Sequence, residues 1–258
     1  MLHSIQTAYS RISLELEPPA AILTLVHPPL NVIDLAMMND LAAALEHVRS
    51  RADLSILLLS GVDEHFSAGV DIKAHTPEKA GDMLKRFHGV IRALASLPLV
   101  TVASVRGECL GGGAELALIC DLAFCTEDSR WGFPEINLGC YPPVAAALLG
   151  QIVGQKRAAE LVLTGNIIHG EQAFTMGMVN DAVPDDELDD LVEEVTQRLA
   201  ALSPMALALT KKALCSSEFE AALARSESIY LNELIHTADA REGIQAWLEK
   251  REPRWTGK

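Results

Sequence analysis

The chain opens with alternating apolar and polar positions and continues with short, almost wholly apolar runs. Residues 12–16 alternate, and an apolar run at 20–26 follows, which together predict a pair of strands. The runs at 54–60 and 99–105 are as short and apolar as strands buried on both faces usually are. Stretches with helical spacing separate these runs, so the pattern predicts an α/β architecture with parallel strand pairing.

Helical patterns recur along the chain and dominate its second half. Asp34 is a suitable N-cap for a helix over residues 35–50, and Pro77 is a suitable first residue for a helix reaching residue 95. Further helices are expected at 144–152, 155–163, 170–176, from 184 to 202 and from 204 almost to the end, with a short strand near 178–183. We therefore expect a mixed α/β core over residues 1–200 and a helical region over 201–258.

Composition narrows the possible functions. The 258 residues carry a net charge of −14, which argues against a nucleic-acid surface because phosphate binding needs clustered Lys and Arg. No run reaches 18 apolar residues, and the first residues lack the basic and apolar regions of a signal peptide. The five cysteines, an odd number without a C-x-x-C pair, fit a reducing compartment. We expect a cytoplasmic protein without membrane or nucleic-acid partners.

A glycine-rich stretch at residues 106–115 is the strongest candidate for a ligand site. Gly112 and Gly113 are expected to open a helix whose first N–H groups have no partner and suit a developing oxyanion. Glu115 then lies in the first turn of that helix. The alternative is a glycine-rich turn in which Glu115 only interacts favourably with the helix dipole.

A second glutamate, Glu135, lies in the stretch 132–139, where Pro134 and Gly139 shape the chain. Two carboxyl groups in different surroundings can divide acid and base roles, although Glu135 alone is equally consistent with a capping role. The sequence lacks a P-loop, a dinucleotide glycine motif, a G-x-S-x-G elbow and an H-E-x-x-H motif, and we expect no metal site. His88, in an apolar helical stretch, is either a core histidine or part of the site.

Five stretches in order resemble the enoyl-CoA hydratase/isomerase, or crotonase, superfamily: 65–73 (HFSAGVDIK), 107–115 (GECLGGGAE), 134–139 (PEINLG), Thr164-Gly165 and the tail 241–258. The resemblance implies a spiral of β-β-α units closed by C-terminal helices and assembled as a homotrimer or homohexamer. It also implies an acyl-CoA thioester substrate and no cofactor beyond the CoA of that substrate.

Matched to the family's motifs, the backbone N–H groups of Val70 and Gly112 form the oxyanion hole, and Glu115 and Glu135 are the catalytic acids. Retention of both glutamates favours a hydratase, in which Glu115 orients water and Glu135 exchanges the proton. The remaining substrate-binding positions are expected to be Ala68, Gly69, Asp71, Ile72, Lys73, Gly111, Phe87, His88, Tyr141 and Pro142. Lys250 and Arg251 are further candidates, with Lys73, for contacts to the CoA phosphates.

One departure from ordinary enoyl-CoA hydratases concerns the acyl pocket. Tyr141, Pro142 and Pro143 occupy positions where small, flexible residues are usual, which predicts a stiffer pocket. With this feature and the stretches 31–34 (NVID), 84–91 (LKRFHGVI), 134–139 (PEINLG) and 230–234 (YLNEL), the chain is similar to the cyclohexa-1,5-diene-1-carbonyl-CoA hydratases of anaerobic benzoyl-CoA degradation. Those enzymes form 6-hydroxycyclohex-1-ene-1-carbonyl-CoA. A straight-chain 2-enoyl-CoA hydratase and a crotonase-fold binding protein remain the alternatives.

Overall fold

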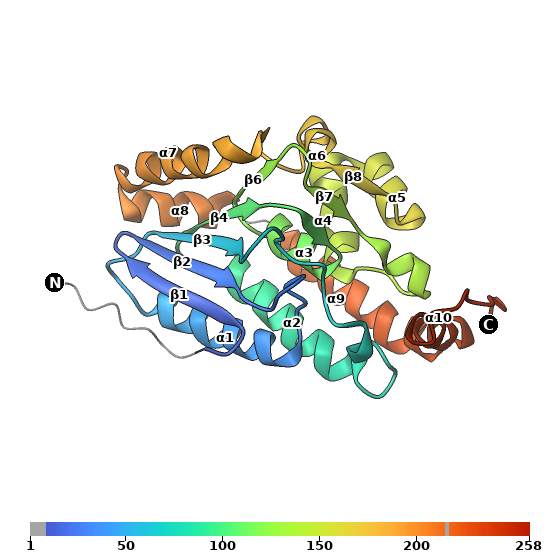
Figure 1. Ribbon diagram of the computed structural model, residues 1–258. Coiled ribbons are helices and arrows are strands. Elements are labelled where there is room, and N and C mark those ends of the chain that lie inside the picture. The colour runs from blue at the N-terminus through green and yellow to red at the C-terminus, as the bar shows by residue number, and fades with distance from the viewer. Residues whose placement is uncertain (1–8, 215–216) are drawn as a thin grey trace.

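A six-stranded sheet runs through the molecule in the computed structural model (Figure 1). The structure describes residues 9–214 and 217–258; the residues considered for a signal peptide, Met1 to Gln6, and Cys215 lie outside this part. The strand order is β1-β2-β3-β4-β6-β9. The bounds are β1 Ile12–Glu17, β2 Ala20–Leu25, β3 Ile56–Gly61, β4 Val100–Val105, β6 Leu122–Thr126 and β9 Asp181–Val183.

Strands β1 and β2 pair antiparallel, and each of the following pairs is parallel, so the predicted α/β architecture is confirmed. A second sheet, in the order β5-β7-β8, was not predicted. Its strands are Glu108–Leu110, Arg130–Gly132 and Ile167–His169. Each strand has three residues, which is too short for an alternating pattern to be recognised.

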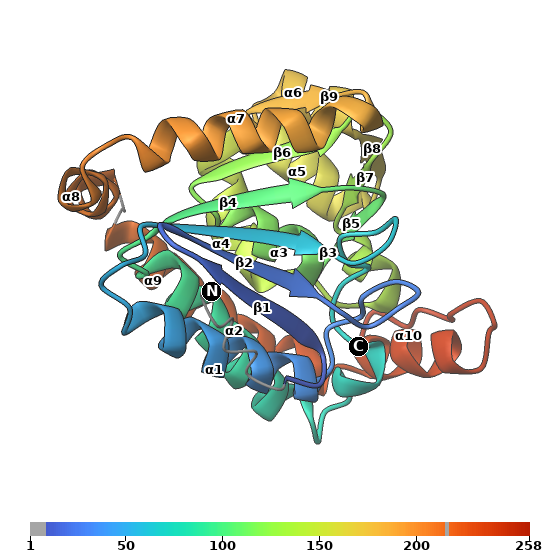
Figure 2. The same ribbon diagram turned by 60° about the vertical axis from the view of Figure 1, so that its left-hand side comes forward.

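The helices cover both faces of the large sheet. Residues of β3 and β4 that alternate along the strands, such as Ile56 and Val102, pack with Leu188 and Val192 of α7, while Leu57 and Leu59 face the main core with α1 and α2. Figure 2 shows α7 across one face and α1 and α2 on the other. The α-helices are α1 Leu35–Arg49, α2 Ala80–Ala95, α3 Gly112–Leu118, α4 Pro143–Val153, α5 Gln155–Thr164, α6 Gly170–Met176, α7 Leu188–Ala200, α8 Pro204–Leu214, α9 Ser217–Asn232 and α10 Ala238–Leu248.

Most of the predicted boundaries lie close to the observed ones. Asp34 caps α1, because its Oδ1 accepts a hydrogen bond of 2.8 Å from the N–H of Met37. Helix α2 begins at Ala80 and not at Pro77, because a short 3₁₀ helix (η1, Ile72–Ala74), a bend at residue 76 and a turn over 77–79 precede it. The stretch 131–143, which is rich in Gly and Pro, contains part of β7 and a 3₁₀ helix, η2, over Pro134–Leu138.

The C-terminal helices do not form one separate layer. Helix α8 contacts β4, α9 runs along α4, and α10 packs against η2 at the opposite end of the molecule from α8 (Figures 1 and 2). Within the described part of the chain, no helix is both long enough and apolar enough to cross a membrane. The domain boundary at residue 200 and the assembly into trimers or hexamers stay predictions.

Candidate active site

A cavity of about 70 Å³ lies where the segment around Gly69 meets the glycine stretch at Gly111 and Gly112. The structure brings together most of the residues that the sequence singled out: Ala68, Gly69, Val70, Ile72, Phe87, His88, Gly111, Gly112, Glu115, Glu135, Tyr141 and Pro142 line it. His75, Met83, Leu84, Pro134, Leu138 and Pro143 complete the lining and were not among the predicted site residues. Segments far apart in the sequence therefore converge on one small volume.

The segment around Gly69 lies directly against the glycine stretch. Ser67 pairs with Cys109, and a Cβ on Gly112 would lie 3.4 Å from the N atom of Val70. The neighbouring Gly111 N–H donates to the carbonyl of Gly132 at 2.9 Å, whereas none of the described residues accepts from the N–H groups of Val70 or Gly112. Two close, unused backbone donors are the arrangement that stabilises an oxyanion.

Glu115 extends from the first turn of α3 to the first residues of α4. Its Oε1 accepts hydrogen bonds of 2.8 and 2.9 Å from the N–H groups of Val144 and Ala145. Because Pro142 and Pro143 have no N–H, these are the first free donors of α4, and the helix dipole there favours negative charge. The start of α4 therefore holds one oxygen of this glutamate in place.

Glu135 approaches the same cavity from η2. A Cβ on Gly111, whose φ is +50°, would overlap the Oε1 atom of Glu135, so only glycine leaves room for this carboxyl group. The Oε2 atom of Glu135 is buried and finds no hydrogen-bond partner within residues 9–214 and 217–258. One carboxyl group is therefore anchored, and the other is held close by but remains free to bind.

Both carboxyl groups hold their protons more tightly than an exposed glutamate does. Burial raises the pKa of Glu115 to about 7, although the two backbone N–H groups act in the opposite direction. Burial and then the nearby charge of Glu115 raise the pKa of Glu135 to about 8. Near neutral pH both carboxyl groups can therefore gain or lose a proton, as a site that transfers protons requires.

Helix α9 supports the cavity from behind and was missed in the site prediction. The hydroxyl of Tyr230 lies 3.1 Å from Nδ1 of His75, and the hydroxyl of Tyr141 donates to the carbonyl of Ser226 at 2.7 Å. Burial lowers the pKa of His75 to about 4. These contacts span more than 80 positions in the sequence, so no local pattern could have revealed them.

None of the charged residues predicted to bind the substrate or its CoA phosphates, namely Asp71, Lys73, Lys250 and Arg251, lines the cavity. Asp71 accepts from the N–H of Lys73 at 3.0 Å and caps η1, and neither side chain lines the cavity. Lys73 and Lys250 are exposed. Arg251 forms ion pairs with Glu242 and Glu249. Their roles toward CoA stay predictions.

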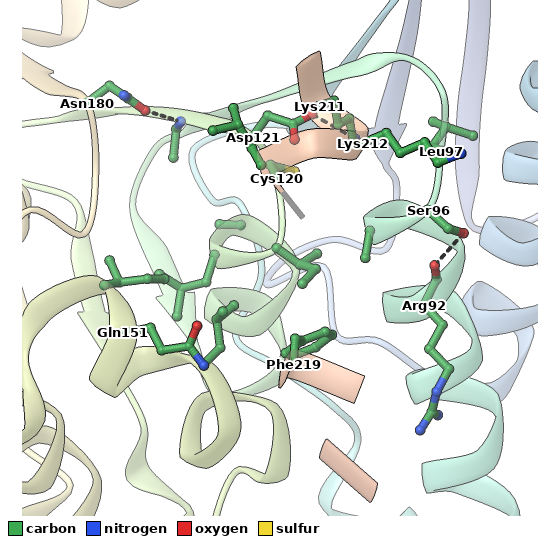
Figure 3. A pocket seen from close by; sticks show the side chains of 18 of the residues that line it. Arg92, Ser96, Leu97, Cys120, Asp121, Gln151, Asn180, Lys211, Lys212 and Phe219 are labelled. Carbon is green, nitrogen blue, oxygen red and sulfur yellow. Dashed lines mark hydrogen bonds and ion pairs between the residues drawn. The ribbon is translucent and has the colours of Figure 1, made fainter. Parts of the chain in front are cut away.

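A larger cavity of about 970 Å³ lies between the C-terminal end of α2, α4 and α8 (Figure 3). Four of its five charged side chains are paired: Lys211 lies 2.7 Å from Asp121, and Arg92 binds Glu220. Most of the remaining lining is aliphatic. The smaller cavity, with its two glutamates and unused backbone donors, is therefore the candidate active site. Among the residues that the structure describes, no three His, Cys, Asp or Glu side chains are placed to hold a metal ion.

The chain is similar to known proteins over nearly its whole length. A family model described as enoyl-CoA hydratase/isomerase matches residues 18–258. A cyclohexa-1,5-dienecarbonyl-CoA hydratase from Thauera aromatica is 35% identical over 90% of this chain and 91% of its own. A probable enoyl-CoA hydratase from Bacillus subtilis is 32% identical over 95% of this chain and 98% of its own.

A solved structure of an enoyl-CoA hydratase from Mycobacterium avium subsp. paratuberculosis superimposes with a TM-score of 0.87. It is 26% identical and covers 96% of this chain and 100% of its own. The expected crotonase-type α/β fold is thus confirmed. The chain belongs to the enoyl-CoA hydratase/isomerase family, whose hydratase members are hydro-lyases.

Proposed function

We propose that this enzyme adds water to cyclohexa-1,5-diene-1-carbonyl-CoA and forms 6-hydroxycyclohex-1-ene-1-carbonyl-CoA, a step of anaerobic benzoyl-CoA degradation. The observation that carries the hydratase part is the pair of buried glutamates beside two unused backbone N–H groups. The relative from Thauera aromatica is named for this cyclic dienoyl substrate, and the stiff wall of Tyr141, Pro142 and Pro143 supports the same choice.

In the proposed reaction, Val70 and Gly112 donate to the thioester oxygen. The oxygen of water bonds to C2 of the ring, the electron pair moves onto the thioester oxygen, and a proton then adds to C5. The new double bond lies between C1 and C6. When the product ring is numbered along this double bond, the carbon that carries the hydroxyl becomes C6, which gives the 6-hydroxy-1-ene. Each backbone donor contributes about 3–4 kcal/mol to stabilising the anionic intermediate.

The two glutamates divide the proton transfer. Because one oxygen of Glu115 is fixed by α4, its other oxygen is left to orient the attacking water. Glu135, with an unpaired Oε2, takes the proton from water and returns it to the ring carbon. We propose that no cofactor beyond the CoA of the substrate takes part.

The cavity has to widen before it can admit a six-membered ring. An engineered cavity of about 150 Å³ binds benzene, so a six-membered ring requires a shift of the side chains around these 70 Å³. Met83, whose side chain is unbranched and flexible, is suited to such a shift.

The proposal is tested by measuring hydration of the cyclic dienoyl thioester and of crotonyl-CoA under the same conditions. We expect kcat/KM to be higher for the cyclic substrate. Turnover of crotonyl-CoA far above that of the cyclic diene would instead favour a straight-chain 2-enoyl-CoA hydratase. This second candidate is supported by the same pair of glutamates and by the Bacillus subtilis relative.

The assignment of the glutamates is tested with Glu115→Gln and Glu135→Gln. Glutamine at position 115 still offers an oxygen to both N–H groups of α4, so the fold is retained while the second oxygen, which orients the water, is lost. We expect each variant to lower kcat by about 100-fold or more. Hydration by Glu135→Gln at nearly the wild-type rate would contradict the proton-transfer role.

A further inference from the structure

His88 on α2 is a buried histidine whose two ring nitrogens have different surroundings. Its Nδ1 lies 2.7 Å from Oε1 of Glu227 on α9. Its Nε2 is buried and has no hydrogen-bond partner in the described part of the chain. The ring lines the cavity that also contains Glu115 and Glu135. A buried polar atom without a partner costs folding free energy, so its retention calls for an explanation.

The contacts of Glu227 determine which nitrogen of His88 carries the proton. Arg92 binds both carboxyl oxygens of Glu227, at 2.9 and 3.0 Å. Burial acts against the charge, but the hydrogen bonds from Arg92 and His88 prevail and lower the pKa of Glu227. Burial likewise outweighs the neighbouring carboxylate and lowers the pKa of His88. A carboxylate only accepts hydrogen bonds, so Nδ1 of the neutral ring carries the proton and Nε2 carries a lone pair.

The residues around the lone pair on Nε2 of His88 indicate which kind of group it binds. The neighbouring lining residues Met83, Leu84 and Phe87 are apolar, so an acceptor among them is satisfied only by a donor that enters the cavity. We propose that Nε2 of His88 accepts a hydrogen bond from an O–H group in this cavity, which is either a hydroxyl on the acyl group or the water that adds to it. His88 is thus a positioning residue, held in the required tautomer by Glu227 and Arg92. The identity of the acyl group rests on the proposed function.

Two substitutions test the roles of the two ring nitrogens of His88 separately. His88→Asn keeps a donor toward Glu227 and loses the acceptor at Nε2, whereas His88→Gln places an amide oxygen near the Nε2 position. His47→Asn on α1 is the matched control, because His47 also has a buried Nε2 without a partner among the described residues but does not line the cavity. Thermal unfolding of each variant establishes that it is folded.

Binding is measured by calorimetry for two thioesters that differ in one hydroxyl, cyclohex-1-ene-1-carbonyl-CoA and 6-hydroxycyclohex-1-ene-1-carbonyl-CoA. All variants are combined with Glu135→Gln so that turnover does not obscure binding. If the acyl hydroxyl is the donor, His88→Asn weakens binding of the hydroxylated thioester by about three- to tenfold. Binding of cyclohex-1-ene-1-carbonyl-CoA is unchanged. His88→Gln restores the tighter binding of the hydroxylated thioester.

If water is the donor, both thioesters bind the variants as they bind the parent protein. With Glu135 present, kcat for hydration then falls about three- to tenfold in His88→Asn at constant KM and recovers in His88→Gln. The proposal is wrong if His88→Asn changes neither binding nor kcat. It is equally wrong if His88→Asn weakens binding of both thioesters alike, or if His88→Gln restores neither binding nor kcat. His88 would then act only through packing.

A measurement on the unaltered enzyme keeps the proposal testable should His88→Asn fail to fold. Nitrogen NMR of ¹⁵N-histidine-labelled enzyme reports the proton on Nδ1, and a hydrogen-bonding ligand shifts the Nε2 signal of His88. A proton on Nε2 instead would overturn the inference. If the wild-type enzyme hydrated neither cyclohexa-1,5-diene-1-carbonyl-CoA nor crotonyl-CoA, the proposed function would fall, while the hydroxyl-dependent binding by His88 would still be measurable.

Discussion

Replacing Glu135 with glutamine removes a carboxyl group that the fold holds in a buried cavity beside a second carboxyl group. Its pKa is raised to about 8 from an ordinary 4.5, first by burial and then by the charge of Glu115. The folded protein therefore binds this proton more tightly than the unfolded chain does. The stability contributed by the proton is fully present below pH 4.5 and is lost as the pH rises through about 8.

The magnitude follows from the same values. At about 1.36 kcal/mol for each pH unit, a pKa of about 8 in place of 4.5 corresponds to about 3–5 kcal/mol of unfolding free energy. Glutamine has no such pH dependence. Relative to wild type, Glu135→Gln is thus expected to become more stable by this amount between pH 5 and pH 9.

The assay is guanidinium chloride unfolding at pH 5, 7 and 9, with the free energies extrapolated to water. Glu252→Gln, at an exposed position in the C-terminal tail, is the control and is expected to follow the wild-type curve. Parallel curves for wild type and Glu135→Gln across this range would refute the reasoning, because the carboxyl group would then be as well solvated in the folded protein as in the unfolded chain.

Three further substitutions test other parts of the structure. In Gly112→Ala the new Cβ would lie 2.7 Å from Cγ2 of Val70 and displace the donor, so kcat should fall about 100- to 1,000-fold with little change in melting temperature. Lys211→Met leaves Asp121 unpaired and should lower the unfolding free energy in urea by about 2–3 kcal/mol, below the usual effect for a fully buried pair because Asp121 is 26% exposed. Gly243→Ala places a Cβ against a carbonyl of η2, so calorimetry should show an unfolding free energy lowered by about 1–3 kcal/mol. Because η2 carries Glu135, kcat should also fall.

Local signals in the sequence predicted the elements that carry the site. The cap at Asp34, the parallel strands β3 and β4 and the helix that opens at Gly112 all follow from patterns within a few residues. Both glutamates were identified from their immediate surroundings and from the family's motifs. Their roles, and those of the backbone donors, await the activity measurements described above.

The tertiary structure alone decided how these parts meet. In the small sheet, β5 pairs with β7, which places Gly111 beside Glu135; three-residue strands leave too weak a pattern for this pairing to be read from the sequence. Helix α9 brings Tyr230 and Glu227 to histidines more than 130 positions away. The physical reason is the same in each case: periodicity reports which face of an element is buried, whereas the partner across that face depends on long-range packing and strand register.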